Sequence, residues 1–319
     1  MSRLANVSID LDGLGCYHTI HRLAEAADPT LMYTLALPRF RELFAELGIK
    51  ATLFVITSDL EHEAVVRELR LAVDEGHEVA SHTHSHPYNL REWTDARIAA
   101  ELKQSEDALF HAVGVRPVGF RTPGYNVDTR ILRILAERGY TYDSSVFPCP
   151  PYYLAKAAVM GVMALSGKPS GSSMTDPAAL LAPLQPYRPS RFNFSRPGDA
   201  THSLPLWEIP MGVVRGVRVP VIGTSIGAVP AAAARAMARA LKLGQPTVQL
   251  EFHGIDMLDR DDVGIVPSLA GRQPDLRRAW RAKRAAYHAC FSEIALTHRF
   301  MTLQQLVEEL DRTSGSSPA

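Results

Sequence analysis

The chain has few cysteines and no excess of charge of either sign. Its three cysteines, Cys16, Cys149 and Cys290, lie far apart among 319 residues. This spacing excludes a disulfide framework and a paired-cysteine metal motif, and it fits a reducing compartment. Lysine and arginine together number 34, and so do aspartate and glutamate. Because no basic field results, we expect no nucleic-acid partner.

Long apolar runs are also missing. No window reaches the roughly 18 uninterrupted apolar residues of a membrane-spanning helix. The first residues, MSRLANVSIDLDG, lack the apolar core of a signal peptide and run directly into a strand-like segment. We therefore expect a cytoplasmic protein, with residues 313–319 forming a disordered tail.

Short strand-like runs alternate with amphipathic helical runs up to residue 145. Strands are expected within residues 5–10, 50–57, 77–81, 118–124, 140–145, 204–210 and 247–252. Helices are expected at 37–48, 62–76, 94–114, with Thr94 as cap and Gly114 as stop, and 128–139. Such alternation predicts an α/β fold with a parallel sheet and outer helices. About seven strands favour a distorted (β/α) barrel, whose chemistry lies at the carboxyl ends of its strands.

One domain is expected over residues 1–312, with an insertion at about 150–205. This segment is rich in Pro, Ser and Gly and contains one apolar stretch, YYLAKAAVMGVMAL. A structureless loop of this length is unusual, so the segment is either a lid or substrate platform over the strand ends or a helix packed on the side of the barrel. The apolar stretch either packs in the core, or holds a lipid tail or makes a peripheral membrane contact.

Two aspartates close the first expected strand, VSIDLDG. Strand side chains alternate between faces, so Asp10 and Asp12 share one face. Two neighbouring carboxylates are costly unless a metal ion or an arginine lies between them. The alternative is an exposed strand end with turn-forming aspartates before Gly13.

Three histidines occupy alternate positions in SHTHSHP, at 82, 84 and 86. Pro87 disfavours a helix at His86, so a strand end here runs into a loop. His82 and His86 with one carboxylate make the three-ligand, open arrangement of catalytic zinc. We expect Zn²⁺, and Co²⁺ or Ni²⁺ suit the same ligands. His84 either supports this site or the substrate rim, or is an ordinary loop histidine.

Other expected strand ends are polar as well. Arg121 lies in FRTPGYN, Asp143 in YDSS and His253 in EFHGID. Each alone has a plain explanation, as a surface arginine, a turn aspartate or a hydrogen-bonded core histidine. Their shared position at strand ends favours a common site.

These motifs together resemble the polysaccharide deacetylase family, which carries the NodB homology domain (carbohydrate esterase family 4). IDLDG resembles its first motif, SHTHSHP its second and RTPGYN its third. The resemblance covers most of residues 5–145 and returns near residues 206–256. The first motif usually has adjacent aspartates. Here Leu11 separates them, as in the branch that includes formyl-arabinose-lipid deformylases and allantoinase-like members.

The resemblance implies a role for each matching residue. Asp10 would be the catalytic base, oriented by Arg121, while Asp12, His82 and His86 would bind the metal and Thr83 would stabilise their loop. His253 would be the catalytic histidine, with Asp143 as the candidate carboxylate beside it. We further expect a backbone N–H near Tyr125 to stabilise the oxyanion, and Trp207 and Glu208 to line the pocket.

The expected function is removal of an N-acetyl or N-formyl group from an amino-sugar substrate that is intracellular or linked to a lipid. Two alternatives stay open: a small-molecule C–N hydrolase, for example on cyclic amides, and an inactive binding module. A wide groove over the metal favours the amino-sugar deacylase, and a closed small pocket favours the small-molecule C–N hydrolase. The intact set of Asp10, Asp12, His82, His86 and Arg121 argues against the inactive module.

Overall fold

The computed structural model describes residues 3–165 and 175–315. A single parallel sheet runs through the molecule in the order β10-β1-β2-β3-β4-β5-β8, and β9 pairs along the whole of β1. Its strands are β1 (Leu4–Asp10), β2 (Thr52–Val55), β3 (Glu78–Ser81), β4 (Gly119–Phe120), β5 (Tyr142–Asp143), β8 (Trp207–Glu208), β9 (Thr247–His253) and β10 (Arg299–Phe300). All seven expected strands form, and the expected α/β barrel-like fold is confirmed. Strand β10 was not expected, because two residues carry no readable alternation.

The barrel is distorted because the described strands at its two edges, β8 and β9, are not joined by backbone hydrogen bonds. In the described part of the chain, no hydrogen-bonded pairing joins β8 to β9. The segment after β8 fills this gap, where Gly212 lies against the carbonyl oxygen of Gln249 so closely that a methyl group would overlap it. Glycine is required here by the close approach of two backbones.

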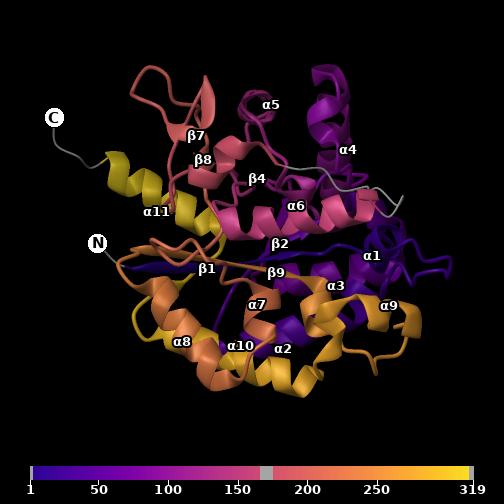
Figure 1. The fold of residues 1–319 in the computed structure, drawn as a ribbon. Coiled ribbons are helices and arrows are strands. Elements are labelled where there is room, and N and C mark those ends of the chain that lie inside the picture. Colours follow the sequence, from indigo (N-terminus) through magenta and orange to yellow (C-terminus); the bar gives the residue numbers. More distant parts are fainter. Residues whose placement is uncertain (1–2, 166–174, 316–319) are drawn as a thin grey trace.

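Helices cover the outside of β1 and β9, where the largest apolar core lies. Figure 1 shows α2 (Leu37–Leu47), α8 (Ala231–Lys242) and α10 (Trp280–Ala295) on one side of these strands. Helix α3 (Glu63–Asp74) contributes to the same core. The strands are apolar on the face toward these helices, as buried parallel strands are.

A second group of elements covers β4, β5 and β8. Helices α4 (Asp95–Val113) and α5 (Thr129–Glu137) share a core with Phe120, and the hairpin of β6 (Pro189–Ser190) and β7 (Asn193–Pro197) adds Phe194. The Thr94 hydroxyl caps α4 by accepting from the Arg97 amide, and Gly114 ends it at φ 73°, as expected.

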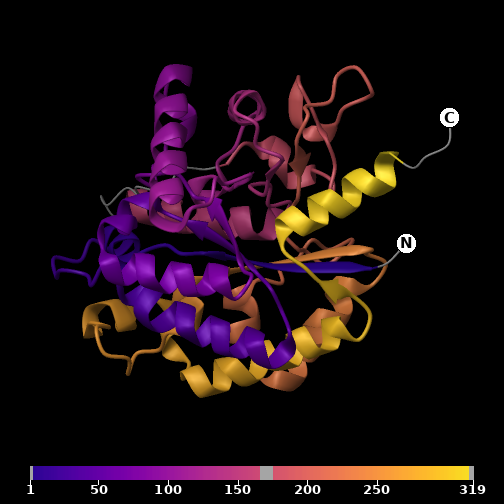
Figure 2. The same ribbon diagram turned by 180° about the vertical axis from the view of Figure 1, so that it is seen from behind.

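Helix α11 closes the amino-terminal end of the sheet. Figure 2 shows α11 (Leu303–Gly315) beside the start of β1, where Leu303 and Leu306 pack in one cluster with Leu4. Residues 313–315, expected in a tail, are therefore helical, and 316–319 lie outside the described residues.

The segment 150–205 contains α6 (Pro150–Leu165), a 3-10 turn (Pro177–Leu181) and the β6–β7 hairpin, while 166–174 lie outside the described residues. Helix α6 buries Tyr153 to 3% exposure and leaves Leu154 72% exposed. Figure 1 shows α6 running across the face of the sheet opposite α8 and α10. None of the described helices combines the length and hydropathy that a membrane span requires. The remaining helices are α1 (Leu14–His21), α7 (Gly223–Gly227) and α9 (Pro267–Arg272).

Candidate active site

Asp12, His82 and His86 converge beyond the carboxyl ends of β1 and β3. The Nε2 atoms of His82 and His86 lie 3.4 and 3.5 Å from Asp12 Oδ1. All three side chains are buried, and Asp12 Oδ1 and His86 Nε2 lack a hydrogen-bond partner among the described residues. Buried polar atoms are rarely left unpaired. Ligand atoms that face one centre without partners fit a bound divalent metal ion.

In both His82 and His86 the Nδ1 atom contacts the protein, and the Nε2 atom faces Asp12. His82 Nδ1 lies 2.8 Å from the backbone oxygen of Arg121, to which it can only donate. His86 Nδ1 lies 3.7 Å from Cys16 Sγ. A proton on Nδ1 leaves the lone pair on Nε2, which is how partners behind a histidine orient it toward a metal. Burial, opposed in part by Asp12, lowers the pKa of His86 to about 4, which favours the neutral ligand form.

The histidine loop holds a strained backbone. Thr83 and His86 adopt φ values of 69° and 54°, in the left-handed region that is unfavourable for a β-branched residue. Thr83 Oγ1 accepts from the His86 amide at 3.0 Å, and Glu101 accepts from the amides of His84 and Ser85. Thr83 is fully buried and so supports the loop rather than touching the pocket. Such strain persists where surrounding contacts fix the loop, here in the shape that aims both ligands.

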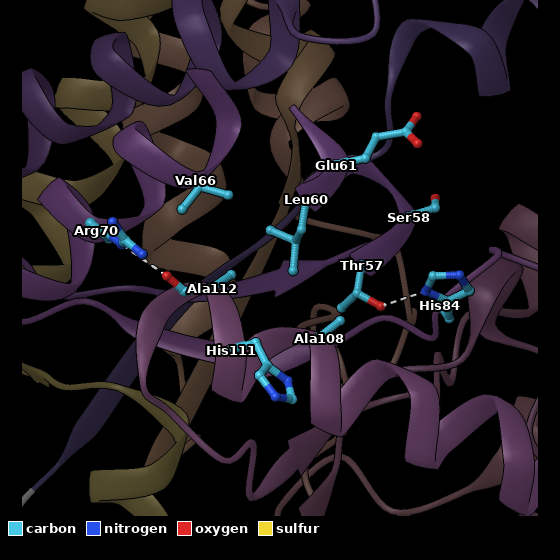
Figure 3. A pocket seen from close by; sticks show the side chains of 10 residues that line it. All are labelled: Thr57, Ser58, Leu60, Glu61, Val66, Arg70, His84, Ala108, His111 and Ala112. Carbon is cyan, nitrogen blue, oxygen red and sulfur yellow. Dashed lines mark hydrogen bonds between the residues drawn. The ribbon is translucent and has the colours of Figure 1, made fainter. Parts of the chain in front are cut away.

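His84 points away from the metal group. Its Nδ1 lies 3.0 Å from Thr57 Oγ1, and its Nε2 accepts from Gln104 at 2.8 Å. His84 lines a separate pocket of about 520 Å³. Figure 3 shows it across this pocket from Arg70. His84 therefore supports the loop that carries the two metal ligands, through its contacts with Thr57 and Gln104.

Asp10 and Arg121 form a buried ion pair at the mouth of the barrel. Arg121 Nη1 donates to Asp10 Oδ1 at 2.5 Å, and Nη2 donates to the hydroxyls of Ser8 and Ser144, both at 2.9 Å. The guanidinium carbon lies 4.1 Å from the centre of the Phe54 ring. Burial raises the pKa of Asp10, and the Arg121 charge acts against that rise. The other oxygen, Oδ2, lies 4.0 Å from His82 Nε2 and so faces the metal group.

His253 lies beside Asp10, because β9 and β1 pair in a register that places these residues opposite each other. His253 Nδ1 lies 2.9 Å from Glu251 Oε1, and the hydroxyl of Tyr125 donates to the same oxygen at 3.1 Å. Burial opposes the imidazolium, but the nearby carboxylates, Glu251 before Asp12 and Asp10, together hold the pKa of His253 well above its usual value. This histidine is therefore set up as a cationic acid.

The structure does not bring Asp143 to His253. Asp143 accepts from the amide and hydroxyl of Ser145, at 3.0 and 2.7 Å, and pairs in register with Glu208. Glu251 holds the position at His253 that the sequence motif assigned to Asp143. Residues at i and i+2 share a strand face, so the LEFH stretch carried the signal for Glu251.

Three further expectations differ from the geometry. Trp207 packs in the core with its Nε1 donating to Asp311, and Glu208 is fully buried with its Oε1 accepting from the Val146 amide. Neither lines the pocket, because β8 is covered on both faces. The backbone N–H of Tyr125 donates to the Thr122 oxygen at 3.1 Å, so the hydroxyl of Tyr125 is the group that reaches the site.

Asp10, Asp12, His82 and His253 open into a pocket of about 470 Å³. Its walls come from α1 and α6 as well as from the strand ends. The residues that line it are Asp10, Asp12, Tyr17, Ile20, His21, His82, Tyr88, Gly124, Tyr125, Tyr152, Ala155, Lys156, Met160 and His253. Of the two alternatives for the inserted segment, these contacts place α6 over the strand ends.

Residues 31–142 match the family model described as polysaccharide deacetylase. The matched region contains His82, His86 and Arg121, and Asp10 and Asp12 stand beside these residues in the structure. Over these residues the chain is similar to the polysaccharide deacetylase family. Its aspartates, separated by Leu11, represent a variant of the usual first motif.

Curated relatives from this family match part of the chain. A peptidoglycan deacetylase from Helicobacter pylori is 29% identical over 129 residues, covering 38% of this chain and 41% of the relative. Chitin deacetylase 1 from Cryptococcus neoformans var. grubii is 33% identical over 104 residues, covering 33% and 22%. The chain thus spans less than half the length of these relatives.

Solved structures of the family share the fold of the whole chain. A structure from Mycobacterium smegmatis described as a polysaccharide deacetylase has a TM-score of 0.61 at 18% identity, covering 100% of this chain and 93% of that one. A carbohydrate esterase family 4 pseudoenzyme from Bacillus anthracis has a TM-score of 0.50 at 11% identity, covering 97% and 66%. These likenesses establish the fold, and the pseudoenzyme shows that activity must be argued from the site.

Proposed function

We propose that this chain is a metal-dependent hydrolase that removes an N-acetyl or N-formyl group from an amino sugar. The observation that carries the proposal is the buried group of Asp12, His82 and His86, in which Asp12 Oδ1 and His86 Nε2 have no hydrogen-bond partner among the described residues. Asp10 and His253 flank this group. Metal-assisted amide hydrolysis needs a base for the attacking water and an acid for the leaving amine, and Asp10 and His253 can fill these two roles.

Each residue has a task that follows from its contacts. A divalent ion on Asp12, His82 and His86 would polarise the acyl carbonyl and lower the pKa of the attacking water. Asp10 Oδ2 faces that group and takes the proton of the water, while Arg121 holds Oδ1 in place. His253, kept cationic by Glu251, gives its Nε2 proton to the leaving amine.

The ligand set also supports the choice of metal. One carboxylate and two imidazoles with an open position are typical of catalytic zinc, so we propose Zn²⁺, with Co²⁺ or Ni²⁺ as substitutes. The cytoplasmic location stays a prediction from the composition of the chain, and fractionation of cells that express it tests that prediction.

The pocket favours a sugar that carries an apolar group over a small cyclic amide. Ile20, Ala155 and Met160 contribute apolar wall to the pocket that contains Asp10, Asp12 and His253. Ile20 is 45% exposed, so the pocket continues to the surface and a longer substrate can extend from it. A lipid-linked amino sugar suits both the apolar wall and the opening to the surface. Its sugar would reach the metal group and its lipid chain would follow the apolar wall.

Acyl release from a substrate panel tests this function. The panel contains N-acetyl and N-formyl amino sugars with methyl or octyl aglycones and two cyclic amides, each incubated with and without a chelator. We expect acetate or formate release that stops with the chelator and is faster for octyl than for methyl glycosides. Hydrolysis of the cyclic amides alone would favour the second function, and no hydrolysis by the zinc-loaded chain would favour a binding module.

A further inference from the structure

A lysine lies in the wall of the catalytic pocket. Lys156 is on α6, one turn after Tyr152 and one turn before Met160, and all three line the pocket that contains Asp10, Asp12 and His253. Residues four positions apart share one face of a helix, so this face of α6 presents an ammonium group between an aromatic and an apolar side chain.

The ammonium group of Lys156 has no partner among the residues that the structure describes. No hydrogen bond or ion pair joins it to them, although its side chain is partly buried. The other sheltered lysines are paired: Lys242 donates to the Glu293 backbone and carboxylate, and Lys283 donates to the Asp275 and Leu258 carbonyls. A partly buried charge without a partner is unfavourable.

The nearby carboxylates are already engaged. Asp10 pairs with Arg121 and Glu251 with His253, while Asp12 faces the two histidine ligands. Burial, with no opposing carboxylate beside it, lowers the pKa of Lys156. No described residue therefore supplies a counter-charge to this lysine, and a bound anion would supply it.

We propose that Lys156 binds an anionic group of the substrate, so that the deacylated sugar carries a phosphate ester or a carboxylate close to its N-acyl group. This inference rests on the proposed function and narrows its substrate class from amino sugars in general to anionic ones. The Nζ group donates charge-assisted hydrogen bonds to the anion, and the apolar neighbours strengthen them by limiting access of water.

Binding of matched sugars to the zinc-loaded full chain tests the inference. The probes are methyl N-acetylglucosaminide, which is neutral, N-acetylglucosamine 1-phosphate and N-acetylmuramic acid, measured by calorimetry together with acetate release. Lys156→Met removes the charge and keeps the length, and Lys156→Arg keeps the charge. Lys50→Met serves as the matched control, because Lys50 is exposed and does not line this pocket.

We expect Lys156→Met to raise the Kd of at least one anionic probe about 10-fold or more while changing that of the neutral probe less than about 2-fold. Lys156→Arg should retain most of the preference, and Lys50→Met should bind all probes as the wild type does. The phosphate and carboxylate arms identify the source of the anion. Equal affinity of wild type and Lys156→Met for every probe would overturn the inference.

The two proposals fail differently. If the wild type releases acetate but Lys156→Met keeps the same preference between anionic and neutral sugars, the deacylase function stands and the anion site falls. If anion binding depends on Lys156 but no probe loses its acyl group, the anion site stands and the deacylase function falls.

Discussion

Arg121 Nη1 and Asp10 Oδ1 are 2.5 Å apart, and the guanidinium of Arg121 is completely buried. The pair links β4 to β1 across the mouth of the sheet. Because Asp10 is the carboxylate that faces the metal group, its partner fixes both its orientation and its charge. Asp10 is therefore joined to Arg121 through the protein interior and not across solvent.

Asp10→Asn should abolish acyl release while leaving metal bound. The amide cannot take a proton, so kcat should fall by about 10²-fold or more. The metal ligands Asp12, His82 and His86 are untouched, so zinc content per chain should stay near that of the wild type.

The Asp10→Asn variant should also be less stable, because the buried charge of Arg121 loses its counter-charge, at a cost of about 3 kcal/mol. Acetate release, elemental analysis and urea unfolding measure the three effects. Activity close to that of the wild type would exclude Asp10 as the base.

His86→Ala and His84→Ala form a matched pair within one loop. His86 aims an unpaired Nε2 at Asp12, whereas His84 is tied to Thr57 and Gln104 on the other side. We expect His86→Ala to lose zinc at chelator concentrations that leave the wild type loaded. His84→Ala should keep the metal, with affinity lowered by at most about 10-fold through looser support of the loop. Competition with a chromogenic chelator measures both affinities, and equal losses would mean that the loop, not the ligand, dominates.

Much of this site could be predicted because the spacing of its residues along the sequence determines which side chains share a face. Alternation along β1 places Asp10 and Asp12 on one face, and Pro87 keeps His86 in a loop. The fold followed from helices and strands whose periods are long enough to read. The failures at Asp143, Trp207 and Glu208 lie on strands of two residues, where no period exists.

On β5 and β8 a shift by one residue reverses the face of a side chain. Ser144, not Asp143, turns toward Arg121, and Asp143 turns toward Glu208. Trp207 and Glu208 are adjacent and so face opposite ways, both into buried surroundings. Only tertiary contacts decide such faces, whereas Glu251 stood two residues before His253 on a readable strand.

Glu251→Gln should move the alkaline limb of the pH profile to lower pH. The pKa of His253 is held above its usual value chiefly by the Glu251 carboxylate, against the effect of burial. Without that charge the imidazolium loses its proton at lower pH, so the acid form is available over a narrower range. The plot of kcat/KM against pH should show this shift, and the acidic limb should move less. A profile that is lower but unshifted would mean that Glu251 only positions the ring.

Glu208→Gln should change how stability depends on pH. Glu208 is fully buried beside Asp143, and burial first and this carboxylate second raise its pKa well above its ordinary value of 4.5. The folded chain therefore holds a proton that the unfolded chain releases above about pH 4.5, so the contribution of the pair falls as pH rises from there, by up to about 1.4 kcal/mol per pH unit. Glutamine needs no proton to be buried, and its Oε1 can still accept from the Val146 amide.

Urea unfolding of the chelated chain at pH 6 and pH 9 measures the difference. The free energy of unfolding should fall less between these pH values for Glu208→Gln than for the wild type. An exposed acid gives the control: Glu61→Gln, 76% exposed at its side chain, should leave the pH dependence as it is. If Glu208→Gln and the wild type lose stability in parallel, the buried pair does not retain its proton over this range, and Asp143 and Glu208 must be charged and stabilised by groups other than each other.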